Sequence, residues 1–276
     1  MQKTKIRDLK SNFDEFLVKN LKKIGIKKND CIYLGVNMGN LFKPFKEQMP
    51  LNGNVSKYRK ILSNILFDSI KTYIGSEGTI ICPTFSFSFI RSKRFDKKRT
   101  KSDLGFFTNE FFKKRGVFRT QHPTHSIAIW GKKKNLFKKN FSNFCFGLNS
   151  PFAIFKEIDL KFVNLGVELY KSITYIHHLE HLNGSFHRYY KPVTGYIKIN
   201  NKVTKKKIFT FVIIIKKNFV TDASMIQEKL LSEKKLKLKF DKNVYFSSVS
   251  CNDVHNFGLR LLNTNPVIFM KYNSQI

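Results

Sequence analysis

The spacing of apolar residues along the chain predicts alternating helices and strands. Apolar side chains that return every three or four positions are typical of amphipathic helices, and short continuous apolar runs are typical of buried strands. The first pattern predicts helices at residues 6–24, 56–74, 103–115, 222–239 and 251–262. The second predicts strands at 31–36, from Gly78 to Pro83, at 126–131 and at 161–167, and a hairpin at 195–216 that turns at Asn200 and Asn201.

This alternation predicts an α/β layer architecture. The sequence has no internal repeat and no linker rich in Pro, Gly or Ser, so we expect residues 1–276 to form one compact domain. A chain of this length buries most of its apolar surface without disulfides or a structural metal. Its 29 phenylalanines and 10 tyrosines predict a core rich in aromatic rings.

Basic residues dominate the charge: 51 lysines and arginines stand against 19 acidic residues, a formal net charge of +32. Nucleic acid, a membrane surface and a small anionic ligand are the partners that such a charge attracts. The lysines are scattered rather than gathered in one arm, which indicates compositional drift with a general attraction for anions. No helix-turn-helix, zinc-finger or RNP-type pattern is present, and this disfavours nucleic acid.

Four cysteines lie far apart without a C-x-x-C pair, which argues against a zinc cluster and a disulfide framework. The N-terminal residues are too charged for a signal peptide. The longest apolar run, Phe209–Ile215, falls short of the roughly 20 residues that a membrane-spanning helix needs. We therefore expect a cytoplasmic protein without an integral membrane segment. A polybasic contact with a membrane surface stays open.

Residues 174–184, TYIHHLEHLNG, fit two different chemistries. In the first, His177, Glu180 and His181 match H-x-x-E-H, the inverted zinc-hydrolase signature. A zinc site of this kind needs a third protein ligand from another helix. The candidates lie in a lysine-rich stretch that we expect to be solvated, and they are Glu228 and Glu233.

In the second chemistry the same letters read T-x-x-H-x-x-E. On a helix, His177 and Glu180 are three residues apart, so their side chains share a face. The carboxylate fixes the tautomer of the imidazole and raises its pKa, and such a pair serves as a general base without a metal. Six of the seven histidines lie between residues 122 and 187, which indicates a site in this part of the chain.

Five short motifs in a fixed order resemble those of a known family. They are Cys82-Pro83-Thr84-Phe85-Ser86, the loop from Thr100 to Gly105, RGVFRTQHPTHS at 115–126, NSPF at 149–152 and T-x-x-H-x-x-E at 174–180. Together with a closing segment at 250–269, they resemble the aminoglycoside 3-N-acetyltransferase family. The resemblance implies a three-layer α/β/α fold with a mixed central sheet. It also implies direct, metal-free acyl transfer from an acyl-coenzyme A to the amine of a sugar.

The resemblance further implies roles for individual residues. His177 is expected to be the general base, with Glu180 as its partner. Thr174 or backbone N–H groups are expected to donate a hydrogen bond to the oxyanion that develops during acyl transfer. The other residues expected at the site are His122 beside the catalytic pair, and Thr84, Phe85, Thr124 and His125 on the substrate side.

Coenzyme A brings phosphates, which backbone N–H groups after a strand can hold. The first candidate is the turn after the strand at 31–36, formed by Asn37, Met38 and Gly39. This turn departs from the family, which usually has H-S-S-L at this place. The second candidate is the loop that contains Lys101, Ser102 and Gly105.

The net charge bears on the acceptor. Aminoglycosides are polycations that a positive field repels, whereas a nucleotide-linked amino sugar carries a pyrophosphate that suits a basic groove. We therefore expect N-acylation of a dTDP- or UDP-linked amino sugar for surface polysaccharides such as lipopolysaccharide O-antigen, with a short acyl group. The residues expected to hold phosphate and stack on the base are Arg188, Tyr189 and Lys191.

Three alternatives stay open at this point. The first is an aminoglycoside 3-N-acetyltransferase, and the second is an H-x-x-E-H zinc hydrolase. The third is a basic protein without enzymatic activity that keeps the fold and binds nucleic acid or a membrane. Assembly into a homodimer is left open as well.

Overall fold

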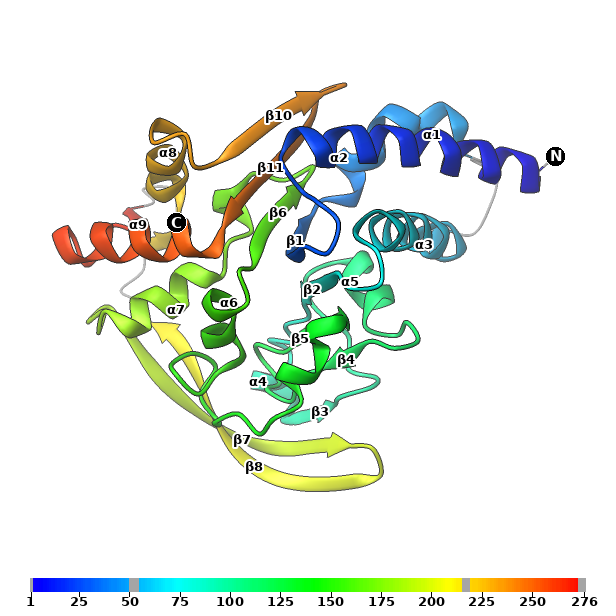
Figure 1. Ribbon diagram of the computed structural model, residues 1–276. Coiled ribbons are helices and arrows are strands. Elements are labelled where there is room, and N and C mark those ends of the chain that lie inside the picture. Colours follow the sequence, from blue (N-terminus) through cyan, green and yellow to red (C-terminus); the bar gives the residue numbers. More distant parts are fainter. Residues whose placement is uncertain (1, 50–54, 215–218, 273–276) are drawn as a thin grey trace.

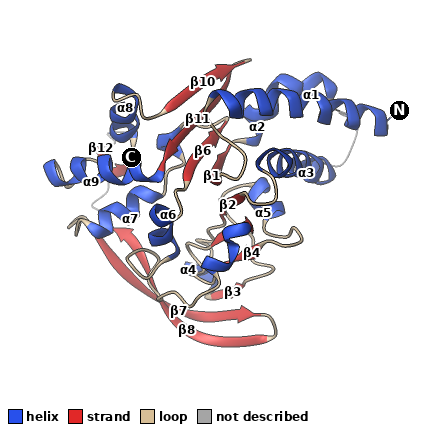
Figure 2. Cartoon of the chain, in the orientation of Figure 1, coloured by secondary structure: helices blue, strands red, loops and turns tan. Residues whose placement is uncertain are grey.

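The computed structural model describes residues 2–49, 55–214 and 219–272, and its centre is a seven-stranded mixed sheet (Figures 1 and 2). Three parallel strands stand in the middle, with β1 (Cys31–Val36) between β2 (Thr79–Pro83) and β6 (Lys161–Leu165). Antiparallel strands extend the sheet on both sides. They are β5 (Ile127–Gly131) and β4 (Phe118–Arg119) beyond β2, and β11 (Val244–Ser250) and β10 (Lys237–Asp241) beyond β6.

Helices cover both faces of this sheet and give the expected three-layer α/β/α arrangement (Figure 1). One face packs against α1 (Gln2–Lys23), α2 (Met38–Phe42), α3 (Val55–Ile74) and α5 (Phe106–Phe111). The other face packs against α6 (Ile154–Glu157), α7 (Tyr175–Leu182), α8 (Ser224–Ser232) and α9 (Cys251–Thr264).

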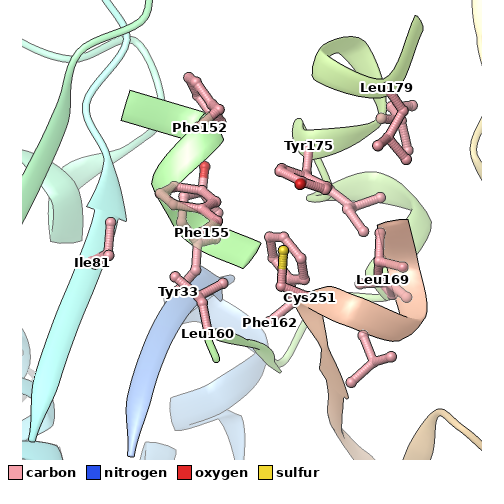
Figure 3. Packing of buried hydrophobic residues seen from close by; sticks show 14 of the residues in the cluster. Tyr33, Ile81, Phe152, Phe155, Leu160, Phe162, Leu169, Tyr175, Leu179 and Cys251 are labelled. Atoms are coloured by element: carbon pink, nitrogen blue, oxygen red, sulfur yellow. The ribbon is translucent and has the colours of Figure 1, made fainter. Parts of the chain in front are cut away.

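Alternate residues of β1 supply the two cores, as the period of two in a strand requires. Ile32 and Leu34 enter the core under α1 and α3, while Tyr33 enters the core under α6 and α7. The second core is rich in aromatic rings, and Figure 3 shows Phe155 of α6 close to Tyr175 of α7. Their ring centroids are 6.0 Å apart, so the first residue of α7 is anchored on the core.

A second sheet lies beside the first and consists of β3 (Arg94–Asp96), β7 (Arg188–Ile199) and β8 (Lys202–Ile213). The predicted hairpin with its turn at residues 200 and 201 is confirmed, but it begins seven residues before the predicted start at 195. Pro192 lies inside the added part, opposite Phe209. The backbone N–H and C=O of Phe209 bond to residues 143 and 145 instead of β7, so the missing N–H of proline breaks no bond of the ladder.

One predicted helix is wrong in its second half. The prediction at 222–239 covers α8 (Ser224–Ser232) and then β10 (Lys237–Asp241). Lys234, with φ of +54°, separates the two elements because a left-handed residue cannot continue a helix. The letters KLKFD alternate between charged and apolar residues, which is the period of a strand. The predicted helix at 103–115 is also shorter and spans Phe106–Phe111.

The remaining elements are short. The longest apolar run, Phe209–Ile215, contributes to β8 as far as it is described. In the described part of the chain, no helix combines the length and the apolar character needed to cross a bilayer. The other short elements are α4 (Phe89–Ser92), β9 (Phe219–Thr221), β12 (Met270–Tyr272), and the 3₁₀ turns η1 (Lys43–Gln48), η2 (Lys132–Phe137), η3 (Pro151–Ala153) and η4 (Leu169–Lys171).

Candidate active site

Helix α7 carries the two residues expected to perform the chemistry. His177 and Glu180 are one turn apart, and the Nδ1–H of His177 donates to Glu180 Oε2 over 2.6 Å. The Glu180 side chain is wholly buried, while the His177 side chain keeps 21 % of its surface exposed. Because Nδ1 carries the proton of this bond, the lone pair of Nε2 is free to take a proton from a ligand.

Two further basic side chains surround the same carboxylate. The Nε2 of His187 lies 3.0 Å from Glu180 Oε1, and the Nε of Arg188 lies 2.7 Å from Glu180 Oε2. The chain reverses after α7 at Gly184, whose φ is +67°, and the N–H of Ser185 donates to the carbonyl of Glu180. This turn brings residues 187 and 188 back onto the helix. Sequence reasoning missed this role of both residues.

The electrostatics of the site favour an ionised carboxylate beside a neutral imidazole. Burial by itself raises the pKa of Glu180, but hydrogen bonds from His177 and His187 and the charge of Arg188 outweigh it and hold the pKa at about 2. Burial also lowers the pKa of His177, against the raising effect of Glu180, and Arg188 lowers it further. The His177 ring is therefore a free base at neutral pH.

The predicted coenzyme loops come together in one cavity of about 410 Å³. Asn37, Met38 and Gly39 form one part of its wall and Gly105 another, and Thr174 stands at the start of the helix that bears His177. Among the described residues, the wall includes neither Lys101 nor Ser102. It gains side chains that sequence reasoning missed, including Phe106, Thr108, Lys171 and Ser172.

The expected turn after β1 is the first turn of α2. Asn37 caps this helix, since its side chain accepts a hydrogen bond of 3.1 Å from the N–H of Asn40. The first N–H groups of a helix have no partner within it, so a ligand can bind them. The N–H of Asn37 itself donates to the carbonyl of Leu165 in β6. The segment is thus fixed to the sheet at the mouth of the cavity.

Gly166, in the loop after β6, allows this loop to approach the backbone of Asn37 and Leu41 closely. Gly166 has φ of +71°, and a Cβ there would lie 2.7 Å from the carbonyl oxygen of Asn37 and 2.9 Å from the backbone nitrogen of Leu41. We expect Gly166→Ala to lower the free energy of unfolding by at least about 1–2 kcal/mol. Gly39→Ala is the matched control, because its nearest neighbour would be a side-chain oxygen at 3.4 Å. Urea denaturation of both variants measures the difference, and equal stability of the two would contradict this account.

His122, Thr124 and His125 form a buried network behind the site. Thr124 Oγ1 lies 3.0 Å from His125 Nδ1 and 2.7 Å from the hydroxyl of Thr210 on β8. His122 Nε2 lies 3.2 Å from the carbonyl oxygen of Asn143, and its Nδ1 lies 3.3 Å from the N–H of His125. Both ring nitrogens of His122 are thus engaged within the protein. His122 also lines a separate cavity of about 200 Å³, and its place beside the proposed catalytic pair stays a prediction.

The two predicted contacts from the end of β2 are buried as well. Thr84 is wholly buried and its hydroxyl donates to the carbonyl of Ser126 over 3.0 Å. The ring of Phe85 packs 4.9 Å from the ring of His125, centroid to centroid. Both residues support the buried histidines, and a direct contact of either with substrate stays a prediction.

The segment from Arg188 to Lys191 divides its side chains between two faces of β7. Arg188 points to Glu180 and Tyr190 to His181, whose Nδ1 lies 3.1 Å from the tyrosine hydroxyl. Tyr189 and Lys191 are exposed and alternate with these residues, so they project from the opposite face. The three side chains predicted to hold one nucleotide therefore do not converge. The guanidinium of Arg188 in particular is occupied by Glu180.

The zinc interpretation finds no cluster in the described part of the chain. No three His, Cys, Asp or Glu side chains there are placed to hold a metal ion. His181 bonds to Tyr190 instead of facing His177, and the proposed third ligands, Glu228 and Glu233, are exposed. All four cysteines are buried and unpaired.

The buried histidines make stability depend on pH. Burial lowers the pKa of His122 to about 4 and that of His178 to about 3, and it moves the pKa of His125 in the same direction. The unfolded chain therefore binds more protons than the folded one below the ordinary value of 6.5. Stability is fully present above that value and is lost as the pH falls towards 4, by about 1.4 kcal/mol per pH unit for each such group.

Urea unfolding at pH 7 and pH 5 measures this dependence. In the matched variant His178→Gln one titrating group is removed, so the slope of the unfolding free energy against pH should decrease by the contribution of one histidine. A stability that stays constant between the two pH values would contradict the assignment of neutral buried rings.

Comparison with known proteins places this geometry in a family. The model of the family described as "Aminoglycoside 3-N-acetyltransferase" matches residues 55–262, which is most of the chain. No curated protein matches the sequence. Among solved structures, aminoglycoside acetyltransferase AAC(3)-IVa is similar, with 17 % identity, a TM-score of 0.68, and coverage of 93 % of this chain and 90 % of that one.

Two more solved structures share the fold. AAC-IIIb, solved as a binary complex with CoASH, has a TM-score of 0.73 at 16 % identity, with 95 % of this chain and 98 % of that chain covered. The YokD protein from Bacillus subtilis has a TM-score of 0.69 at 16 % identity, with 91 % and 99 % covered. The family match covers the residues of α7, and the roles of His177 and Glu180 stay predictions. The chain belongs to the aminoglycoside 3-N-acetyltransferase family and is an N-acyltransferase.

Proposed function

We propose that this protein transfers an acetyl group from acetyl-coenzyme A directly to an amine of an aminoglycoside, with His177 as the general base. The observation that carries the proposal is the place of α7. This helix holds the His177–Glu180 hydrogen bond of 2.6 Å. His177 follows one turn after Thr174, which lines the 410 Å³ cavity. The proposed general base therefore lies on the helix whose N-cap residue lines the cavity proposed for the thioester.

The reaction needs a base because a protonated amine cannot attack a thioester. Nε2 of His177 takes a proton from the amine while the nitrogen bonds to the carbonyl carbon. Glu180 stabilises the imidazolium that forms. The C–S bond then breaks, and the proton passes to the thiolate sulfur of coenzyme A. Thr174 or backbone N–H groups near it can donate to the oxyanion in between. The cycle needs no covalent enzyme intermediate.

The cavity is our candidate site for the coenzyme. Residues 37–39, which follow β1, and residues 104–108, which lead into α5, line it, and its wall also includes Lys171, which pairs with Glu168 over 3.1 Å. N–H groups at a helix start and a lysine are suited to phosphate. AAC-IIIb, which shares the fold, has been solved with CoASH. These features support coenzyme A as the co-substrate.

The comparisons support an aminoglycoside acceptor better than the nucleotide-linked sugar that the charge led us to expect. The matching family is described by aminoglycoside acetylation. Proteins that share the fold have been solved with a gentamicin, with apramycin and with sisomicin. The net charge of +32 still favours an anionic acceptor, and a nucleotide-linked amino sugar is therefore the second candidate.

One assay separates the two acceptors. The purified protein is incubated with acetyl-coenzyme A, and the release of free thiol is followed with sisomicin and, in parallel, with a UDP-linked amino sugar. We expect turnover with sisomicin. Turnover with the nucleotide sugar alone would overturn the aminoglycoside assignment and keep the transferase, whereas thiol release with neither would contradict both candidates.

A further inference from the structure

We propose that Arg188 is a positioning residue of the catalytic pair: it fixes the Glu180 carboxylate and offsets its charge, so that His177 remains an uncharged base at neutral pH. The inference rests on the proposed function only for its effect on rate. Its effect on the protonation of His177 holds whatever the acceptor is.

The guanidinium of Arg188 is held by contacts from three different elements. Its Nε forms an ion pair of 2.7 Å with Glu180 Oε2 on α7 that lacks hydrogen-bond geometry, and its Nη2 donates to the hydroxyl of Thr221 on β9 over 2.9 Å. Its central carbon lies 5.7 Å from the centre of the Phe211 ring on β8. Only 6 % of the Arg188 side chain is exposed, so the group cannot swing away to bind a phosphate without leaving Glu180 unpaired.

The distances show why the charge of Arg188 reaches the reaction. Glu180 Oε2 accepts from His177 Nδ1 at 2.6 Å and meets Arg188 Nε at 2.7 Å, so one oxygen serves the base and the cation together. A carboxylate that served His177 alone would stabilise the imidazolium strongly and keep the ring protonated. With Arg188 present, the buried charges of Glu180 and Arg188 sum to zero, so the protonated form of His177 is stabilised less.

Other titratable groups also lie near His177, Glu180 or Arg188. His187 approaches the second oxygen of Glu180 at 3.0 Å, and its Nδ1 is buried with no hydrogen-bond partner among the described residues. His125, on the loop before β5, interacts electrostatically with His177, and the thiol of Cys145 interacts with Arg188. Burial lowers the pKa of His177 and Arg188 lowers it further, as this arrangement requires.

The test follows the protonation of His177 directly. The C2–H resonance of His177 is titrated by NMR in the full chain, for wild type, Arg188→Met and Arg188→Lys. We expect the midpoint to move to higher pH by about 1–3 pH units in Arg188→Met, the change that one close charge typically causes. In Arg188→Lys, which keeps the charge, it should stay near wild type. Lys207→Met, which removes an exposed charge from β8, is the control and should also leave the midpoint in place.

Activity supplies a second readout. The loss of kcat/KM in Arg188→Met should be large at pH 7 and shrink at pH 9, where His177 is again unprotonated. An unmoved His177 midpoint in a variant that still unfolds cooperatively, or an uptake of the extra proton by His187 instead, would overturn the proposal. So would an activity loss that is equal at both pH values. Wild-type protein that acetylates no amine would refute the proposed function alone, since the NMR titration needs no substrate.

Discussion

Replacing His177 with glutamine is expected to lower kcat for acetyl transfer by a factor of about 10²–10⁴, the usual contribution of a general base. Glutamine fills a similar space and can still bond to Glu180, but it cannot take a proton from the amine. The affinity for coenzyme A should stay within a factor of about 3, because the cavity walls are unchanged. Steady-state kinetics and calorimetric titration with coenzyme A measure both quantities.

The matched control for this variant is His181→Gln, one turn further along the same helix. The ring of His181 bonds to the hydroxyl of Tyr190 rather than to the Glu180 carboxylate. We expect it to retain activity close to wild type. A His177→Gln enzyme that keeps full activity would mean that the proton goes elsewhere.

The second large effect is expected from Glu180→Ala, and it concerns stability as well as rate. The carboxylate is wholly buried and stands among three basic side chains, so its removal leaves Arg188 as an unpaired buried charge. Breaking a buried ion pair from one side typically costs about 3–5 kcal/mol. We expect a loss of unfolding free energy of this order in urea, together with loss of acetyl transfer.

The double variant Glu180→Ala, Arg188→Met provides the control for that interpretation. It removes both charges, so much of the lost stability should return while activity does not. If the double variant is as unstable as the single one, the unpaired guanidinium is not the cause of the loss.

Glu180 also predicts how the ion pair responds to acid. Its pKa is held at about 2 in the folded protein against an ordinary value of 4.5, so its contribution is fully present above 4.5 and is lost as the pH falls towards 2. This range overlaps the lower part of the range of the buried histidines. Stability measured as a function of pH should therefore begin to fall below about 6.5 and fall more steeply below about 4.5, where Glu180 adds its contribution.

The hydrogen bond between His177 and Glu180 could be predicted from the sequence because its geometry is local. Residues three apart on a helix share a face in any helix, and His177 and Glu180 needed no tertiary information. The layers of the fold followed from the same kind of local reasoning. The six residues of β1 form one short and mostly apolar run, the pattern of a strand that is buried on both faces. The motifs of the family then indicated what the pair does.

The partners of that pair could not be predicted, because they depend on how the chain returns after α7. Arg188 was expected to bind phosphate since an arginine in a basic segment normally faces solvent. Its burial follows from the turn at Gly184 and from the side of β7 on which residue 188 falls, and neither is fixed by local spacing. The strand at Lys237–Asp241 was missed because a lysine-rich sequence is compatible with both a solvated helix and an edge strand.

The shape of the cavity also could not be predicted from local sequence. Asn37 and Gly105 are far apart in the sequence, and only the packing of α2 and α5 on one face of the sheet brings their loops together. The sequence indicated each loop as a possible phosphate contact, with Lys101 and Ser102 among the candidates. Of that loop, the wall includes the predicted Gly105 together with the start of α5, and its described lining contains neither Lys101 nor Ser102.

The most direct test is a crystal structure of the protein with coenzyme A and sisomicin bound together. We expect an acceptor amine within about 2.6–3.2 Å of Nε2 of His177, the reach of a general base. We also expect the sulfur of the coenzyme to enter the cavity lined by residues 37–39, Gly105 and Thr174. A coenzyme bound elsewhere, or an amine that meets a different basic group while His177 points away, would contradict it.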